Sequence, residues 1–277
     1  MFGSRRADSL VPNYVILLLL VVFAIGPLVV LVSNAFKSPQ ELIANPLGLP
    51  MRPTLANFPE AWRVGEFATT IGNSVFLVVT TVFVELLLTG LAAYSLARLN
   101  PPGQNGFMGY MLVGSTLPIW LFLVPLFYMW SRMGLTNTLY GLAILYVAFN
   151  APFATFLLRA FMVQIPRDFE DAARVDGANE VSVFTRVILP LTWPGFLTVG
   201  LVVGLGGWNE FQTALIFTSN PKLFPVALSY YKFTSRFGRD WSLTSAAAFM
   251  MIAPVLILFL AMQRRFIAGL SQGGIKG

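Results

Sequence analysis

Six long apolar runs constrain the fold of this chain more than any other feature of its sequence. A helix needs about 20 predominantly apolar residues to cross the hydrocarbon core of a bilayer. Six segments reach about this length, so we predict an all-α membrane protein, a polytopic bundle of six transmembrane helices. The predicted spans are approximately Tyr14–Val32, Gly72–Leu96, Phe107–Trp130, Leu139–Phe161, Gly195–Phe217 and Leu243–Met262.

The composition agrees with lipid as the main solvent. Only 11% of the 277 residues are charged and 56% are hydrophobic, whereas a soluble domain carries about 25% charged residues. The chain has no Cys and no His, which excludes disulfides, thiol nucleophiles and histidine-based metal or acid–base sites. The net charge of +6 fits Lys and Arg at lipid headgroups. No basic cluster is long enough to follow a nucleic-acid backbone, so no nucleic-acid partner is expected.

The charges at the ends of the chain favour cytoplasmic termini. The first apolar run follows Arg5 and Arg6, but it is too long for a signal-peptide core and lacks a small-x-small cleavage site. We therefore expect it to remain as a span. That basic pair and Arg264–Arg265 after the last span favour both termini inside. The sequence shows no internal repeat or linker, so residues 1–277 are predicted to be one domain, with outer loops at about 33–71 and 218–242 and a cytoplasmic loop at 164–194.

The predicted cytoplasmic loop contains the segment "DFEDAARVDGANEVSVFTRVILP", residues 168–190. We expect Asp168 to cap a short helix, with Glu170 and Asp171 in its first turn, where the helix dipole favours negative charge. Asp176 and Gly177 predict a stop and a turn.

A second short helix is expected after this turn, capped by Asn179. Val181, Phe184 and Val187 or Ile188 would then lie on one apolar face.

The small residues Ala172 and Ala173 would let a partner approach the first helix closely. The loop could instead pack on its own protein or lie in the headgroups. An isolated short helix needs a surface to dock on, and an acidic first turn is repelled by an anionic membrane. We therefore favour a protein partner.

The spacing of this loop resembles the EAA loop of ABC-importer permeases, which has the pattern EAA, three residues, glycine, nine residues and I-x-L-P. The matching positions here are Asp171-Ala172-Ala173, Gly177 and Val187-Ile188-Leu189-Pro190. Asp171 stands where the pattern has Glu and keeps the negative charge. Val187 stands where I-x-L-P has Ile and keeps the branched shape. The resemblance implies that the loop contacts an ATPase through Glu170, Asp171, Ala172, Ala173, Asp176, Gly177, Ala178, Phe184, Val187, Leu189 and Pro190.

Other segments extend the resemblance over nearly the whole chain. "PTLANFPEAW", "AAYSLARL", "DAARVDGAN" and "WNEF" are similar to the carbohydrate-importer branch of the family. The resemblance implies a type I importer fold in the inner membrane of a bacterium or archaeon. It also implies a second permease subunit, a dimer of ATP-binding subunits, an extracytoplasmic solute-binding protein and a carbohydrate substrate. The motifs identify the family and not the sugar.

The chain carries no motor of its own. It contains no G-x-x-x-x-G-K-[ST] loop for ATP, no catalytic triad and no metal-binding cluster. We therefore expect that it is not an enzyme and binds no cofactor, and that ATP and Mg²⁺ are bound by the partner ATPase.

Two carboxylates lie inside apolar segments, where a charge usually faces a cavity or a partner. Glu210 follows Trp208 and Asn209; these three residues either line the transport path or, through Glu210, form interhelical hydrogen bonds that join two permeases. Glu85 is a candidate for an interface, for the path, or for the proton carrier of a self-powered secondary transporter. Six spans without an inverted repeat argue against that last alternative.

The outer stretch "LSYYKFTSRFGRDW" is aromatic and basic. It is typical of an interfacial belt, and the resemblance adds a second interpretation as a docking surface for a solute-binding protein, with Arg236 and Arg239 as the residues to test.

Overall fold

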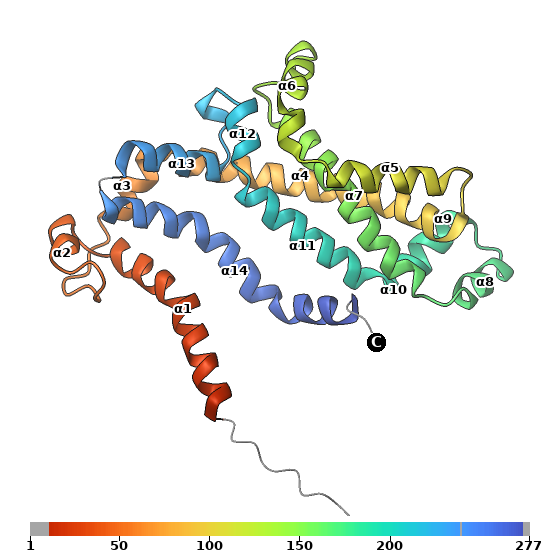
Figure 1. Ribbon diagram of the computed structural model, residues 1–277, viewed down its shortest axis with the longest axis horizontal. Coiled ribbons are helices and arrows are strands. Elements are labelled where there is room, and N and C mark those ends of the chain that lie inside the picture. The colour runs from red at the N-terminus through yellow and green to blue at the C-terminus, as the bar shows by residue number, and fades with distance from the viewer. Residues whose placement is uncertain (1–10, 239, 274–277) are drawn as a thin grey trace, which may run out of the picture. The chain divides into compact units, whose positions relative to one another are not determined.

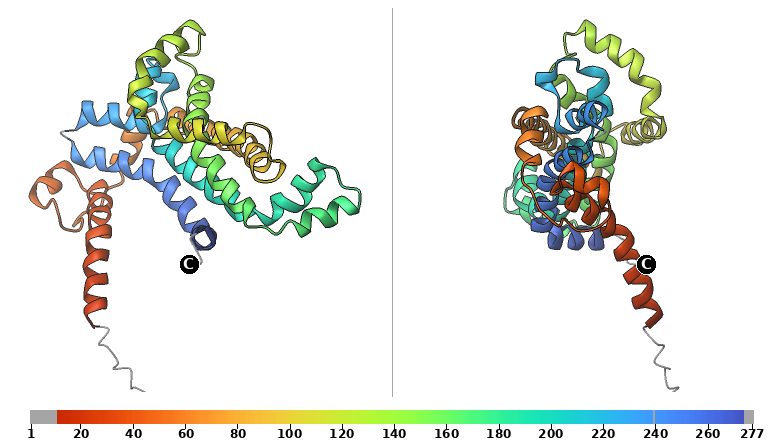
Figure 2. Two further views of the ribbon diagram at one scale, coloured as in Figure 1. Left: turned by 45° about the vertical axis from the view of Figure 1, so that its right-hand side comes forward. Right: turned by 90° about the vertical axis from the view of Figure 1, so that its left-hand side faces the viewer.

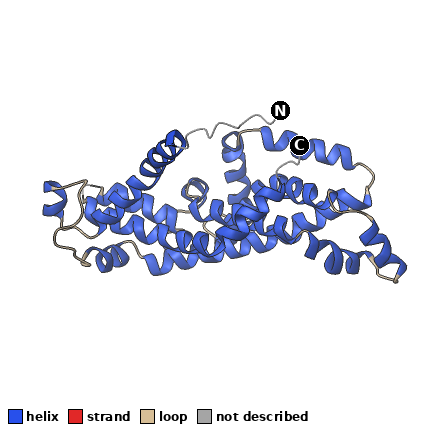
Figure 3. Ribbon diagram, turned by 90° about the horizontal axis from the view of Figure 1, so that it is seen from below, coloured by secondary structure: helices blue, strands red, loops and turns tan. Residues whose placement is uncertain are grey.

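The computed structural model describes residues 11–238 and 240–273, and every regular element among them is a helix (Figures 1 and 3). The described residues form two compact units. One contains the residues up to Glu66 together with Lys232–Ala253, and the other contains Phe67–Tyr231 together with the residues from Pro254 onward.

The first unit begins with α1 (Val11–Ala35), followed by α2 (Pro39–Ala44) and α3 (Asn57–Val64). None of the most apolar stretch of α1 is buried within the chain, as expected for a helix whose surroundings are lipid or a partner. The segment after α1 is held by polar contacts: the Lys37 ammonium donates to the carbonyl of Asn45, and the Asn57 amide donates to the carbonyls of Ala35 and Lys37. Asn57 belongs to the "PTLANFPEAW" segment, which therefore has a structural role.

The second unit is built on three packed helices: α4 (Phe67–Tyr94), α7 (Leu139–Val163) and α11 (Trp193–Asn209). Gly90 of α4 allows close packing, because a Cβ atom there would lie 2.8 Å from the ring of Phe196. A short π-helix, η1 (Ser95–Leu99), continues α4. The core at this end contains Ala93, Tyr94, Ala97, Ala154, Leu158, Met162, Val183, Ile188, Phe196, Val199 and Val203.

The remaining helices of the second unit are shorter than α4, α7 and α11. They are α5 (Gln104–Thr116), η2 (Ile119–Phe122), α6 (Leu123–Arg132), α8 (Asp168–Val175), α9 (Glu180–Val183), η3 (Phe184–Ile188), α10 (Leu189–Leu191), α12 (Gln212–Phe217) and η4 (Pro221–Leu223). Two helices, α13 (Val226–Phe237) and α14 (Trp241–Gly273), each have residues in both units.

Four described helices are long and apolar enough to cross a membrane, and six spans result if two bent helix pairs each count as one. One bent pair corrects the predicted span Phe107–Trp130: α5 and the η2–α6 helix meet at 94° (Figure 1). The break lies at Leu117 and Pro118, because a residue before proline avoids helical geometry and proline lacks an N–H. Leu117 accordingly has φ −80° and ψ 132°.

The other bent pair is Glu180–Leu191 with α11, at 75°. The predicted span Gly195–Phe217 is interrupted at a different place. Helix α11 ends at Asn209, and Glu210 has an extended backbone before α12 begins. The "WNEF" motif therefore lies at a helix break, although the predicted span runs through it.

Candidate coupling loop and transport-path residues

Residues 168–191 form two arms joined by a turn, and this loop projects beyond the ends of α4 and α7 (Figures 1 and 2). The first arm is α8, and the second is the continuous run α9–η3–α10. Gly177 joins them with φ +86°, a conformation that glycine adopts without steric penalty. The Ala178 N–H donates to the carbonyl of Ala173 at 3.0 Å, which closes the end of α8. The predicted stop and turn is confirmed.

The predicted cap of the second helix is confirmed, but that of the first is wrong. The Asn179 side chain accepts a hydrogen bond from the Ser182 N–H at 2.9 Å. Asp168, by contrast, is the first residue of α8; the capping position belongs to Arg167, which makes no side-chain cap. Glu170 and Asp171 lie in the first turn, as predicted, and Asp168 lies there with them.

The predicted apolar face of the second helix is partly wrong. Val181 is 72% exposed, whereas Val183 and Ile188 are fully buried. Residues Phe184–Ile188 are π-helical, and the wider π turn changes which positions share a face relative to a 3.6-residue period. Phe184 packs on Tyr94, with ring centroids 5.1 Å apart.

The two alanines of the first arm have different surroundings. Ala172 is exposed, whereas Ala173 is half-buried and packs against the core at the end of α4, α7 and α11. Only Ala172 is therefore free for close approach by a partner, and a charge at Ala173 would disturb the protein's own packing.

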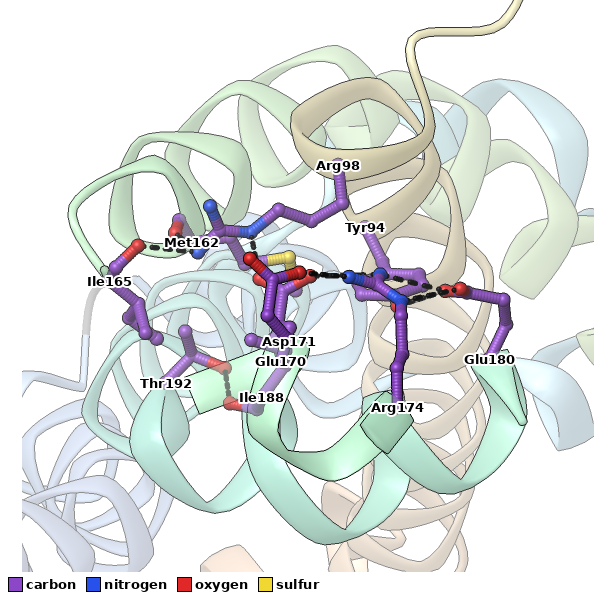
Figure 4. A network of polar contacts seen from close by, with 10 residues as sticks. All are labelled: Tyr94, Arg98, Met162, Ile165, Glu170, Asp171, Arg174, Glu180, Ile188 and Thr192. Atoms are coloured by element: carbon purple, nitrogen blue, oxygen red, sulfur yellow. Dashed lines mark hydrogen bonds and ion pairs between the residues drawn. The ribbon is translucent and has the colours of Figure 1, made fainter. Parts of the chain in front are cut away.

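Glu170 is buried rather than outward-facing, and it forms an ion pair with Arg98 of η1 (Figure 4). The Arg98 Nε and Glu170 Oε1 atoms are 2.7 Å apart, and both side chains are at most 3% exposed. Arg98 Nη2 also donates to the carbonyls of Met162 and Ile165 at 2.6 and 2.8 Å. One guanidinium therefore connects the end of the second span, the end of α7 and the first arm.

Arg174 connects the two arms to each other. Its guanidinium contacts Glu170 and Asp171 on α8 and Glu180 on α9, at 3.0–3.3 Å. The hydrogen bond to Glu180 raises the pKa of Arg174, and the hydrogen bonds from Arg174 and Tyr94 lower the pKa of Glu180. The Tyr94 hydroxyl donates to Glu180 Oε2 at 2.6 Å. The second arm is thus also attached to α4.

Sequence reasoning did not identify Tyr94 and Arg98 as partners of the loop, although both lie in the "AAYSLARL" segment. An arginine at the end of an apolar span, near an acidic loop in the predicted topology, was the available signal. Spacing along the chain could not specify which acid it pairs with.

The outward side of the loop presents apolar and acidic groups. Phe169, Val175 and Val181 are 53%, 87% and 72% exposed, and the Asp171 side chain is 67% exposed. Of the other predicted contact residues, Ala172, Asp176, Gly177 and Pro190 are exposed, whereas Ala178, Val187 and Leu189 are half-buried. The outward side of the loop is therefore exposed and partly apolar.

Glu210 is held within its own chain. Its carboxylate accepts a hydrogen bond from the Tyr146 hydroxyl on α7 at 2.9 Å and from the Thr213 N–H at the start of α12 at 2.8 Å. It therefore stabilises the break between α11 and α12. Trp208 is buried, whereas Asn209 is exposed and donates to the carbonyl of Leu205.

Two cavities lie beside the helices of the second unit. One, of about 670 Å³, is lined by α4, α5, α6 and α7 and includes Thr89, Tyr110, Phe149 and Pro152. The other, of about 640 Å³, is an apolar groove between α4, α11 and the part of α14 from Pro254 onward. Of the four predicted path residues, only Trp208 lines either cavity, and it lines the apolar groove.

Glu85 lies in α4, fully buried, and among the described residues no hydrogen-bond partner reaches either carboxylate oxygen. Thr81 and Thr89 lie one helical turn away on the same face.

Because Gln matches Glu in shape without the charge, Glu85→Gln is expected to leave assembly intact and to change the rate of substrate uptake. Uptake by reconstituted vesicles, with co-purification as the control for assembly, checks this. Loss of assembly without a separable transport defect would contradict it.

Helices throughout the described residues, with up to six candidate spans, define a polytopic membrane protein. Residues 85–271 match the family described as binding-protein-dependent transport system inner membrane component, and the chain belongs to this family. It is a permease component of an ABC transporter.

Relatives cover almost the whole chain. The sulfoquinovosyl glycerol transport system permease protein SmoH of Agrobacterium fabrum is 34% identical over 94% of this chain and 91% of its own. The diacetylchitobiose uptake system permease protein NgcG of Streptomyces coelicolor is 34% identical over 99% and 91%. The fold is similar to a chain of a bacterial ABC transporter involved in the import of the acidic polysaccharide alginate, with a TM-score of 0.83, 22% identity, and coverage of 96% of this chain and 100% of that one.

Proposed function

We propose that this chain is one of two permease subunits of an ATP-driven importer for a carbohydrate, and that the loop at residues 168–191 receives the motion of a separate ATPase dimer. The observation that carries the proposal is the two-sided loop: Glu170 and Ala173 face the protein, whereas Phe169, Val175 and Val181 face outward. A loop of this kind can transmit force between a partner and the spans.

The carbohydrate class is supported by relatives whose names specify sulfoquinovosyl glycerol, diacetylchitobiose and trehalose. A solved complex of the similar alginate transporter includes an alginate-bound periplasmic protein, which supports a solute-binding protein as a partner here. We infer that ATP and Mg²⁺ are bound by the ATPase, and that both termini lie in the cytoplasm, since the loop must face the ATPase.

Three of the arginines singled out in the sequence, Arg5, Arg6 and Arg239, lie outside the described residues. Arg236 lies over the ring of Phe237 in α13.

The proposal is tested by reconstituting the chain with an ATPase, a second permease and a solute-binding protein from the same organism. ATP-dependent sugar uptake and ATP hydrolysis stimulated by the binding protein are the expected results. Uptake by this chain alone in ATP-free, proton-energised vesicles would contradict the proposal and favour a secondary transporter.

Val175→Asp is expected to weaken the attachment of the ATPase. Val175 is 87% exposed on α8, so a charge there barely affects folding but disrupts an apolar contact with a partner; burial of one valine contributes about 1.5 kcal/mol or more, which corresponds to a loss of about tenfold in affinity. Co-purification of the ATPase measures this. Ile43→Asp is the matched control, because Ile43 is 82% exposed on α2, in the predicted outer loop. Equal ATPase recovery with both variants would contradict docking at Val175.

A further inference from the structure

The end of the second span is joined to both arms of the loop by two side chains one helical turn apart. Tyr94 contacts Glu180 on the second arm and Arg98 contacts Glu170 on the first. Arg174 connects these two acids to each other. Figure 4 shows this network, together with Asp171, Met162 and Ile165.

Arg98 is nearly inaccessible to water, as Glu170 is, and it also connects the network to the end of α7. Its side chain is 3% exposed. It donates to the carbonyl of Met162 in the last turn of α7 and to that of Ile165 just after it, where the helix dipole favours a cation. Arginine is suited to this position because its planar fork can donate in several directions at once. The residue is located in a π-helical turn, a distortion that is frequent at functional sites.

Stability alone does not explain a buried ion pair at this point. Removing two charges from water is unfavourable, and apolar residues of similar volume often replace such pairs without loss of stability. What an ion pair with fixed geometry adds is a defined orientation of the two elements that carry it.

We propose that Arg98 is the positioning residue of energy coupling: through Glu170 and the two α7 carbonyls it makes α8 move as one body with α4 and α7. Motion of the ATPase then reaches two spans at once. Without these contacts of Arg98, α8 can follow the ATPase while the spans remain in place. The inference rests on the proposed function of the loop and assigns the transmission of force to a residue outside it.

The decisive variant is Arg98→Met combined with Glu170→Leu, which replaces the pair by apolar side chains of similar size and leaves no buried charge unpaired. Reconstituted transporter is expected to assemble and to hydrolyse ATP, but its sugar uptake per ATP hydrolysed should fall about tenfold, within the range by which single residues alter coupling between distant sites. Arg98→Lys keeps the charge but loses the fork, so its uptake per ATP should fall less.

Arg159→Gln is the matched control. Arg159 on α7 donates to the carbonyl of Leu96, so its loss removes an arginine–carbonyl contact at the same end of the bundle without touching the loop. Its uptake per ATP should equal that of the wild type.

A second measurement follows the position of α8 relative to α4 directly. Since the chain has no Cys, spin labels can be introduced as Leu91→Cys on α4 and Asp168→Cys on α8, which are both exposed. In the complete complex, the distance distribution between them should be narrow in the wild type and broad in the double apolar variant.

Unchanged uptake per ATP in the double apolar variant would overturn the proposal, as would loss of the assembled complex in this variant and in Arg98→Lys alike, because the pair would then serve folding only. Absence of ATP-dependent uptake in the wild-type complex would instead overturn the function proposed above.

Discussion

Replacing Gly177 by proline is expected to reduce ATP-dependent uptake by more than about tenfold while the spans still insert. Gly177 has φ +86°, whereas proline fixes φ near −65° and has no N–H, so the hydrogen bond from Gly177 to the carbonyl of Arg174 is lost. Backbone strain of this kind costs about 1–3 kcal/mol, which the loop relieves by changing the angle between its arms. Uptake and ATP hydrolysis by the reconstituted transporter measure the result.

A matched pair of alanine variants separates the loop's role from general strain. Gly177 and Gly103 have φ of +86° and +82°, and a Cβ at either meets no atom within 4 Å. Gly177→Ala and Gly103→Ala therefore carry similar strain, but only the first is expected to lower uptake per ATP. Full transport by Gly177→Pro would show that the angle between the arms is irrelevant to coupling.

The single substitution Glu170→Leu is expected to destabilise the protein by about 3–5 kcal/mol, because it leaves the Arg98 guanidinium buried without its counter-charge. This is a large fraction of the stability of a typical domain. Thermal unfolding of the purified protein should show a clearly lower midpoint, and adding Arg98→Met should restore most of it.

Glu180→Leu is the control for that measurement. Glu180 is also an acid of the loop bound by an arginine, but its side chain is 48% exposed, and exposed ion pairs contribute about 0–1 kcal/mol. Equal destabilisation by both substitutions would mean that burial of the Arg98–Glu170 pair is energetically unimportant.

The two helix breaks show where pattern reasoning loses information. Each predicted span runs through a break, one at Pro118 and one at Glu210, and the backbone turns by 94° at the first. Proline at position 118 was a local signal for a break. Glu210, which follows the end of α11, is held by the nearby Thr213 N–H and also by the hydroxyl of Tyr146, 64 residues away.

The loop divides in the same way. Its turn at Gly177 and its cap at Asn179 follow from local chemistry, because glycine and asparagine satisfy the nearby backbone groups by themselves. The direction in which each side chain faces depends instead on tertiary packing. On α8, Glu170 meets Arg98 and Ala173 packs on the core, while Val175 is exposed. On the second arm, the π turn at Phe184–Ile188 also alters the helical period.

The sequence by itself determined the all-helical membrane class, the approximate spans, the two-armed loop and the family, because length, hydropathy and local turn chemistry act over a few neighbouring residues. Only the tertiary structure decided that Arg98 meets Glu170 and that Glu210 is held by Tyr146. These contacts join residues 72 and 64 positions apart, and a buried charge selects its partner through the packing of whole helices, which no local pattern contains.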